Sequence, residues 1–196
     1  MTMTATGAPA GLHCDLNYEP AIYVACLASY NSGNLYGYWI NLSVAETKEE
    51  IQECIDWILK HSPVPGAEEY AVHDSQGLCG PCKGTEWPDL DQLEELAHAY
   101  NFTCSDQTEW IAYRMLCNDE NEILSEDDFR DRYCGVYDRP EDFAYELAVE
   151  IGHEVDGAKW PFSCVDWERA WRELGYDGYS AEYSSEAGGY IVTRPA

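Results

Sequence analysis

Basic residues are scarce in this chain. Against 37 Asp and Glu there are only 11 Lys and Arg among 196 residues, which gives a formal net charge of −26 at pH 7. Because nucleic-acid binding relies on Lys and Arg to neutralise phosphates, the composition argues against direct binding of nucleic acid. The chain is nevertheless 45% hydrophobic and 13% aromatic, and disordered acidic segments contain few aromatic residues. The sequence therefore predicts a folded, strongly acidic protein.

Long apolar runs are also missing. No stretch approaches the ~18 consecutive apolar residues that a membrane-spanning helix needs, and residues 1–12 lack the basic and apolar regions of a secretory signal peptide. We expect no membrane association and a cytoplasmic location. The nine cysteines are odd in number and scattered along the chain, so most are expected to be buried thiols and not a disulfide framework.

Familiar catalytic and cofactor motifs are absent. The chain has no Gly-x-Ser-x-Gly nucleophile elbow, no Gly-x-x-x-x-Gly-Lys phosphate loop and no Gly-x-Gly-x-x-Gly fingerprint. His153-Glu154 lacks the second His of a zinc-protease helix, and Asp119–Arg130 has Leu124 and Arg130 where a calcium loop needs Gly and Glu. Paired carboxylates arise by chance in a chain with 37 acids. The sequence predicts no enzyme and no cofactor.

Cys79-Gly-Pro-Cys82 is the exception, because it matches the redox motif of thioredoxins. That chemistry needs the first cysteine at a helix N-terminus, whereas Lys83–Pro88 is a poor helix start, and nearby acids raise a thiol pKa. One Cys-x-x-Cys without a second pair is a weak zinc signal. Further zinc ligands would have to come from His73, His98 or Cys104. We therefore interpret the segment as a structural loop without a chemical role. The alternative is a thiol- or zinc-dependent module that uses Cys79 and Cys82.

The pattern of apolar residues predicts an α+β fold in three parts after a flexible arm of residues 1–20. In residues 21–78, two β-rich runs around an Asn/Gly turn predict a hairpin. Thr47 and Glu50 form a capping box before apolar residues at helical spacing, and a returning strand is expected at Glu69–His73.

The middle part, residues 79–121, is expected to be helical, with helices that begin near Asp89 and Ser105. Residues 122–196 are expected to form a second α+β part. Its predicted elements are a helix around Phe129 and Tyr133 that Gly135 ends, a helix that starts at Pro140, a helix capped by Asp166, and a terminal hairpin over residues 176–193.

The charge itself suggests a function. An ordered domain with this much like charge works against its own stability, so we expect the charge to have a use, and imitation of DNA is the first candidate. Duplex DNA carries one negative charge per ~1.7 Å of axis, so a charge of −26 corresponds to on the order of 44 Å of duplex. The alternative is an acidic surface that serves only solubility or a high-salt habitat.

Acidic residues recur on the outer faces of the expected helices. Asp142, Glu146 and Glu150 stand four apart, a spacing that disfavours a helix by ~0.2–0.5 kcal/mol per like-charge pair, so folding alone does not select such a row. The candidate DNA-mimicking carboxylates are Glu49, Glu53, Asp89, Asp91, Glu94, Glu95, Asp127, Asp128, Asp131, Asp138, Glu141, Asp142, Glu146 and Glu150.

The order of several segments resembles that of ArdA-type antirestriction proteins, over about residues 21–193. The first block is the most specific, with Tyr-Asn-x-Gly-x-Leu-x-Gly-x-Trp followed by Gly-Ala-Glu-Glu-Tyr. The segments that carry the resemblance are Ile22–Asn31, Gly33–Ile40, Pro65–Asp74, Tyr133–Tyr137, Asp142–Gly152, Val165–Leu174 and Gly189–Val192.

This resemblance implies a non-enzymatic inhibitor that occupies the DNA site of type I restriction-modification enzymes, with their methyltransferase core as the partner. It also implies an elongated chain of three small α+β or helical domains that forms a homodimer through its C-terminal part. The antirestriction motif of the family would fall on about Phe143–Gly157, which makes Phe143, Leu147 and Ile151 candidate dimer residues. Binding of other basic proteins, such as histone-like factors, is an alternative. The N-terminal arm and the Cys79–Cys82 loop depart from the family pattern.

Overall fold

A computed structural model describes residues 7–15, 19–103, 106–152, 159–160 and 162–195. Within these residues the fold is α+β, with seven α-helices and two small antiparallel sheets. The contacts divide the chain into two compact units: Met1–Ser105 with Tyr113–Ser125, and Asp106–Ala112 with Glu126–Ala196. The predicted division into three domains in series stays a prediction. No helix in the described ranges is long and apolar enough to cross a membrane.

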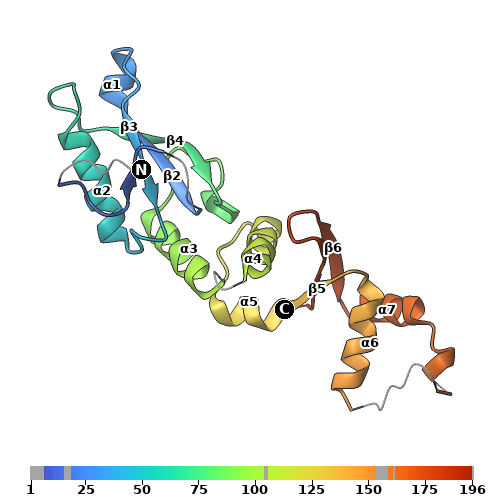
Figure 1. The fold of residues 1–196 in the computed structure, drawn as a ribbon. Helices are drawn as coiled ribbons and strands as arrows, with labels where there is room; N and C mark the ends of the chain where they lie inside the picture. The colour runs from blue at the N-terminus through green and yellow to red at the C-terminus, as the bar shows by residue number, and fades with distance from the viewer. Residues whose placement is uncertain (1–6, 16–18, 104–105, 153–158, 161, 196) are drawn as a thin grey trace. The chain divides into compact units, whose positions relative to one another are not determined.

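The first unit contains a four-stranded antiparallel sheet in the order β1-β3-β2-β4 (Figure 1). The predicted hairpin is confirmed, because β2 and β3 pair with Ile22 opposite Ile40. A short helix, α1 (Leu27–Asn31), occupies part of the connection between them. The strands are β1 (Leu12–His13), β2 (Ala21–Cys26), β3 (Gly37–Asn41) and β4 (Tyr70–Gln76).

Strand β1, at the edge of this sheet, lies in the segment that was expected to be a flexible arm. That expectation was wrong for these residues. Leu12 is buried and pairs with Ile40, and the Asn41 amide donates a hydrogen bond to the Gly11 carbonyl at 2.8 Å. Gly11 permits this close approach, since a Cβ there would lie 2.8 Å from the Ala45 Cβ. A two-residue strand is too short to show the alternation by which strands are recognised in sequence.

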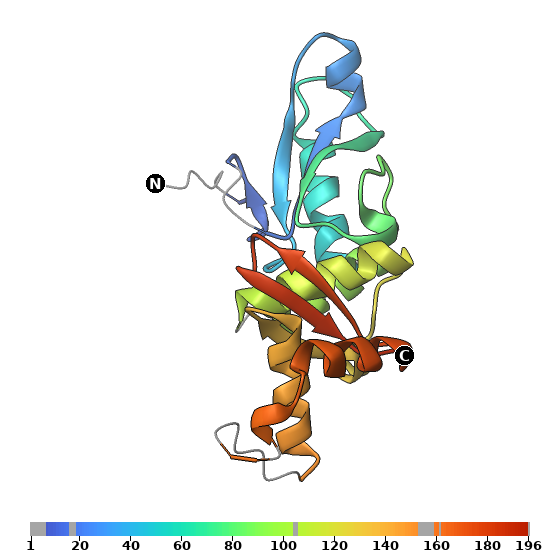
Figure 2. The ribbon, with the colours of Figure 1, turned by 90° about the vertical axis from the view of Figure 1, so that its right-hand side faces the viewer.

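Helix α2 (Lys48–Lys60) packs against β2 and β3 (Figure 2). It begins with the predicted capping box. The Glu50 amide donates to Thr47 Oγ1 at 3.3 Å, and the Thr47 amide donates to Glu50 Oε2 at 3.2 Å. The apolar stripe of α2 is buried; its members are Ile51, Cys54, Ile55 and Ile58. Capping and periodicity therefore predicted this helix correctly.

A helical segment follows β4. A single turn of 3-10 helix, η1 (Gly80–Cys82), precedes α3 (Leu90–Thr103), and α4 (Gln107–Glu120) comes next, its residues from Tyr113 onward belonging to the first unit. Leu93, Leu96 and Tyr113 are fully buried. The expected start of α3 at Asp89 is confirmed, while Ser105, the expected start of the next helix, lies outside the described residues.

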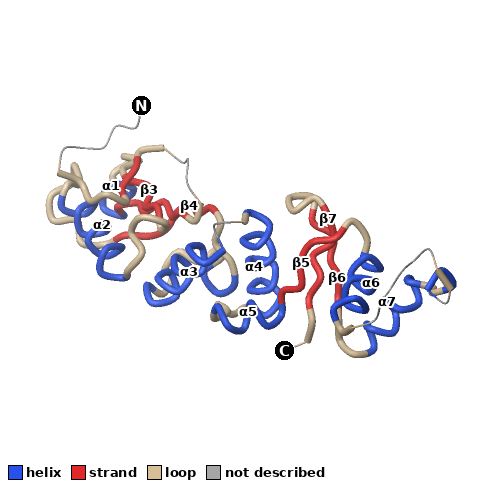
Figure 3. The backbone as a smooth tube through the Cα atoms, turned by 60° about the horizontal axis from the view of Figure 1, so that its bottom comes forward, coloured by secondary structure: helices blue, strands red, loops and turns tan. Residues whose placement is uncertain are grey.

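The second unit holds a three-stranded antiparallel sheet in the order β5-β7-β6 (Figure 3). The predicted terminal hairpin is confirmed as β6 paired with β7. Helix α6 packs against β5, β7 and α7. The elements are α5 (Glu126–Arg132), β5 (Tyr133–Tyr137), α6 (Pro140–Glu150), η2 (Phe162–Cys164), α7 (Trp167–Tyr176), β6 (Ser180–Ser184) and β7 (Gly189–Thr193).

An aromatic cluster centred on Phe143 forms the core of this unit. The Phe143 ring lies 5.5 Å from the ring centroids of both Tyr137 and Tyr179 and 6.2 Å from that of Trp171. These separations fall within the range of favourable edge-on and tilted aromatic contacts. The cluster joins α6 to the sheet and to α7.

The prediction that Gly135 ends a helix was wrong. Gly135 lies inside β5, and Tyr133, expected in that helix, is the first residue of the strand. The pairing of β5 with β7 shifts register between Tyr133 and Gly135, where Gly135 has φ +119°. Glycine serves both as a helix stop and as a bulge residue, so its sequence position alone does not separate the two.

Replacement of Thr47 by Ala tests the capping box. We expect the free energy of unfolding of the first unit to fall by about 1 kcal/mol, because the Glu50 amide loses its acceptor. Urea titration followed by circular dichroism measures the change. Thr47→Ser is the control, because Ser keeps the acceptor; equal destabilisation by both variants would contradict the cap.

Candidate interaction surface

The predicted carboxylates lie on the surface of both units. All of them are exposed except Glu94, Glu141 and Asp142, which are half-buried. They occur on helices α2, α3, α5 and α6, except Asp89 and Asp138, which lie one and two residues before α3 and α6. A helix fixes the direction of each side chain, so the acids are presented from ordered backbone.

The structure brings the acids of α2 and α3 together around Lys48. Lys48 Nζ lies 2.5 Å from Asp91 Oδ1, and the Lys48 amide donates to Glu94 Oε2 at 3.0 Å. The hydrogen bond to Asp91 raises the pKa of Lys48. Glu49 and Glu53 line an adjacent open groove of about 430 Å³. Lys48 thus neutralises part of this acidic cluster.

Asp89 has a role in the fold as well as on the surface. Its Oδ1 accepts a hydrogen bond from the Asp91 amide at 2.9 Å, at the start of α3. Burial, followed by the charges of Asp89 and Glu95, raises the pKa of the Cys82 thiol to about 12. Changes at Asp89 would therefore alter both the helix start and the surface charge.

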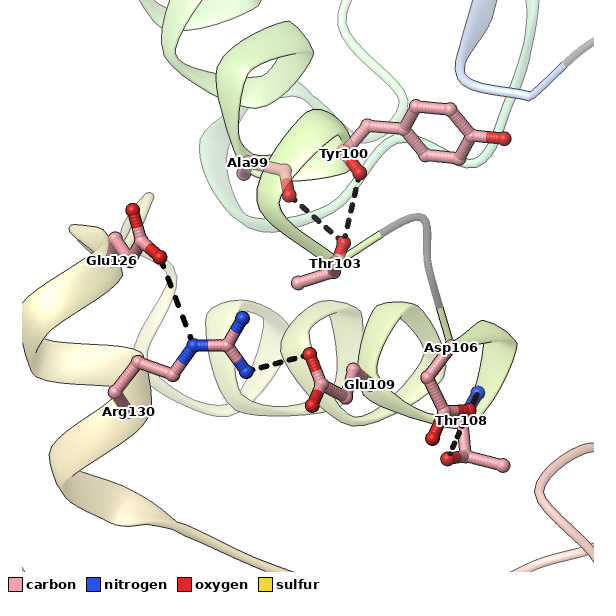
Figure 4. Close-up of polar contacts among 8 residues, drawn as sticks. All are labelled: Ala99, Tyr100, Thr103, Asp106, Thr108, Glu109, Glu126 and Arg130. Carbon is pink, nitrogen blue, oxygen red and sulfur yellow. Dashed lines mark hydrogen bonds and ion pairs between the residues drawn. The ribbon is translucent and has the colours of Figure 1, made fainter.

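Helix α5 presents Asp127, Asp128 and Asp131 as exposed side chains. Beside them, Arg130 extends between two acids that are not among the predicted carboxylates: its Nη1 lies 2.6 Å from Glu109 Oε2, and its Nε lies 3.8 Å from Glu126 Oε1 (Figure 4). Asp131 Oδ1 lies 3.7 Å from Arg194 Nη2. Two of the few arginines thus face the α5 acids.

The other contacts in Figure 4 are local to helix ends. At the end of α3, Thr103 Oγ1 donates to the carbonyls of Ala99 and Tyr100 at 2.8 and 3.2 Å. At the start of α4, Asp106 Oδ1 accepts from both the amide and the hydroxyl of Thr108. These hydrogen bonds lower the pKa of Asp106, so this carboxylate stays charged.

The predicted row on α6 is present but is not free of partners. Arg139 Nη2 donates to Asp142 Oδ1 at 2.6 Å, and Arg139 Nη1 lies 3.6 Å from Glu141 Oε1. The Tyr137 hydroxyl donates to Glu146 Oε2 at 2.6 Å. Burial, with a smaller contribution from Glu146, raises the pKa of Tyr137, so the tyrosine remains a donor. Asp138 and Glu150 are exposed at the two ends of the row.

The three candidate dimer residues have different environments. Phe143 is 7% exposed and belongs to the aromatic core, so it is not available to contact a partner directly. Leu147 is half-buried, and Ile151 is 67% exposed. Val149 is also exposed, at 44%. Residues 153–157 of the expected antirestriction motif lie outside the described residues.

The Cys79–Cys82 motif is not on this surface. Both thiols are fully buried, and Cys79 is the residue directly before the one-turn helix η1. Among the described residues, no three or more His, Cys, Asp or Glu side chains are arranged to hold a metal ion. Of the other ligands considered for zinc, His73 is exposed and its ring packs edge-on against Tyr30, and Cys104 lies outside the described residues.

Comparison with known protein families identifies the family of this chain. A sequence model of the antirestriction protein (ArdA) family matches residues 22–191, nearly the whole chain. The chain belongs to the ArdA family. The resemblance noted in the sequence is thereby confirmed, and antirestriction is the function of the family. A comparison with curated proteins gives no match.

The cations that accompany the acids of this ArdA family member were not predicted from its sequence. The pairs Arg139–Asp142 and Glu126–Arg130 have helical i,i+3 and i,i+4 spacing, so the sequence contained a signal for them. Lys48–Asp91 and Arg130–Glu109 join residues on different helices and could not be predicted without the fold.

Proposed function

We propose that this protein blocks the DNA-binding site of a type I restriction-modification enzyme by presenting carboxylates in place of DNA phosphates. The observation that carries the proposal is the exposed acids on ordered helices of an ArdA family member with a net charge of −26. The partner is the methyltransferase core, which holds the DNA-binding surface. The inhibitor acts without catalysis and without a cofactor.

The physical basis is the electrostatics of DNA recognition. Proteins bind the DNA backbone through Lys and Arg, and these contacts carry no sequence information directly. A carboxylate accepts the same charge-assisted hydrogen bonds from these side chains as a phosphate oxygen does. The ion pairs within the chain leave most acids exposed, so the surface keeps a strongly negative field.

Competition with DNA tests this function. We expect the protein to displace a labelled duplex from a type I methyltransferase core, and its direct affinity for that core to fall as salt rises, because salt screens the attraction. Fluorescence anisotropy measures the displacement and titration calorimetry the affinity. Poly-glutamate of matched charge is the control for charge without defined arrangement.

Two outcomes would contradict the assignment. One is failure of excess protein to displace DNA from every type I core tested. The other is equal binding to a histone-like DNA-binding protein, which would indicate a general acidic binder of basic proteins.

The working unit in this proposal is a homodimer joined through the C-terminal part. Ile151 and Val149 provide exposed apolar side chains at the end of α6, inside the region expected to hold the antirestriction motif. A dimer doubles the acidic surface offered to the enzyme. One chain has the charge of on the order of 44 Å of duplex, which is short for a large DNA-binding machine.

Replacement of Ile151 by Asp tests the interface. We expect the dimer to dissociate, because burying an unpaired carboxylate in an apolar contact is costly, and inhibition to weaken although an acid has been added. Light scattering after size-exclusion chromatography measures the mass. Leu35→Asp is the control, because Leu35 is 86% exposed in the other unit. A dimer that survives Ile151→Asp would place the interface elsewhere.

A further inference from the structure

Three buried cysteines gather in the first unit. Cys79 and Cys82 belong to the segment between β4 and α3, and Cys117 is in the last turn of α4. All three are free thiols with 0% exposure. The proposed inhibition does not use them.

The backbone holds Cys79 close to Cys117. The amide of Gly80, the next residue, donates to Asn118 Oδ1 at 3.1 Å. A Cβ at Gly80, where φ is +54°, would lie 3.3 Å from the Cys117 carbonyl oxygen and 3.0 Å from that of Glu122. This glycine allows the Cys79–Cys82 segment to lie directly on the end of α4.

The two thiols shift each other's pKa in opposite directions. The thiol of Cys79 donates to the sulfur of Cys117, which raises the pKa of Cys79 and lowers that of Cys117 despite burial. A hydrogen bond from the Leu124 amide adds to the lowering at Cys117. Of the two thiols, Cys117 therefore forms the nucleophilic thiolate more readily. Cys79 is the neighbouring thiol that can react with it next.

We propose that Cys79 and Cys117 are an oxidative modification site that a peroxide converts to a disulfide, tying the Cys79–Cys82 segment to α4. The Cys117 thiolate attacks one peroxide oxygen, the O–O bond breaks, and the products are a sulfenic acid and hydroxide, which becomes water on protonation. The Cys79 sulfur then attacks the sulfenic sulfur and the S–O bond breaks. The hydroxyl group leaves as water with the Cys79 proton. One hydrogen peroxide is reduced to two waters and two thiols are oxidised.

The pairing differs from the one that the Cys-x-x-Cys motif suggests. Cys82 is held protonated by burial and by Asp89 and Glu95, with its pKa raised to about 12, and its amide is part of the η1 turn, donating to the Cys79 carbonyl at 3.2 Å. The hydrogen-bonding partner of the Cys79 thiol is on α4. Cys82 is therefore a bystander in this reaction.

Local opening gives the oxidant access. The Cys79–Cys82 segment is a single 3-10 turn, and short segments with few regular backbone hydrogen bonds open at lower free energy than the whole domain. Hydrogen peroxide is close to water in size. Oxidation is expected to be slower than at an exposed thiol for this reason.

Peptide mapping after oxidation tests the site. The experiment uses the full chain with Cys14→Ser and Cys164→Ser, because these changes remove two exposed thiols. The protein is reduced, treated with hydrogen peroxide, blocked with an alkylating reagent and analysed by mass spectrometry. We expect a Cys79–Cys117 linkage, retained in Cys82→Ser and lost in Cys79→Ser and Cys117→Ser. Cys54, a buried thiol whose pKa burial raises to about 12, is the internal control and should stay reduced.

The outcomes separate clearly and do not depend on variants that fail to fold, because the linkage is mapped first in the chain with all three cysteines intact. The melting temperature of the protein should rise by about 5 °C or more on oxidation, since the disulfide closes a long loop. Reduction should return the melting temperature to its starting value. A Cys79–Cys82 linkage, or the absence of a Cys79–Cys117 linkage after prolonged treatment with excess peroxide, would overturn the proposal. Inhibition of the restriction enzyme is not needed as a readout.

Discussion

Repulsion among carboxylates acts on nearly every surface helix of this chain, and the two apolar cores have to offset it. In the first unit, α2 buries Ile51, Ile55 and Ile58 at 0% exposure beneath a face that carries Glu49 and Glu53. In the second, α6 buries Phe143 among aromatic rings. Each helix thus anchors its inner face in apolar packing and fixes its outer acids, which is how a chain with this charge presents an ordered anionic surface.

The few cations reduce this repulsion where acids are most crowded. Lys48, Arg130 and Arg139 each lie near two carboxylates. Exposed ion pairs contribute only about 0–1 kcal/mol each, so they relieve local repulsion without cancelling the field. The proposed partner would supply Lys and Arg side chains to the acids that remain exposed, and binding would then lower the repulsive energy that the free protein retains.

The sequence predicted the elements that have strong local signals. The capping box at Thr47, the proline at the start of α6 and the Asp166 cap of α7 all mark helices that the structure contains. Strand β1 and the bulge at Gly135 were missed because their signals are short or ambiguous. The site was predictable only in part: helical spacing locates the acids of α6, but contacts such as Lys48–Asp91 and Cys79–Cys117 join residues far apart in sequence, and only the fold brings them together.

The central claim is that many ordered carboxylates act together, and neutralisation of the α6 acids tests it most directly. The α6 set (Asp138, Glu141, Asp142, Glu146 and Glu150, each changed to its amide) is compared with a matched set of equal charge from the same unit (Glu168, Glu173, Asp177, Glu182 and Glu186) and with Glu146→Gln alone, at equal folded concentration. We expect neutralisation of the α6 set to raise the inhibitory concentration by on the order of 10-fold or more, and neutralisation of the matched set to raise it by less. Glu146→Gln alone should weaken binding only slightly, by about 1 kcal/mol or below. Equal effects of the two sets, or loss of inhibition from Glu146→Gln alone, would contradict this claim.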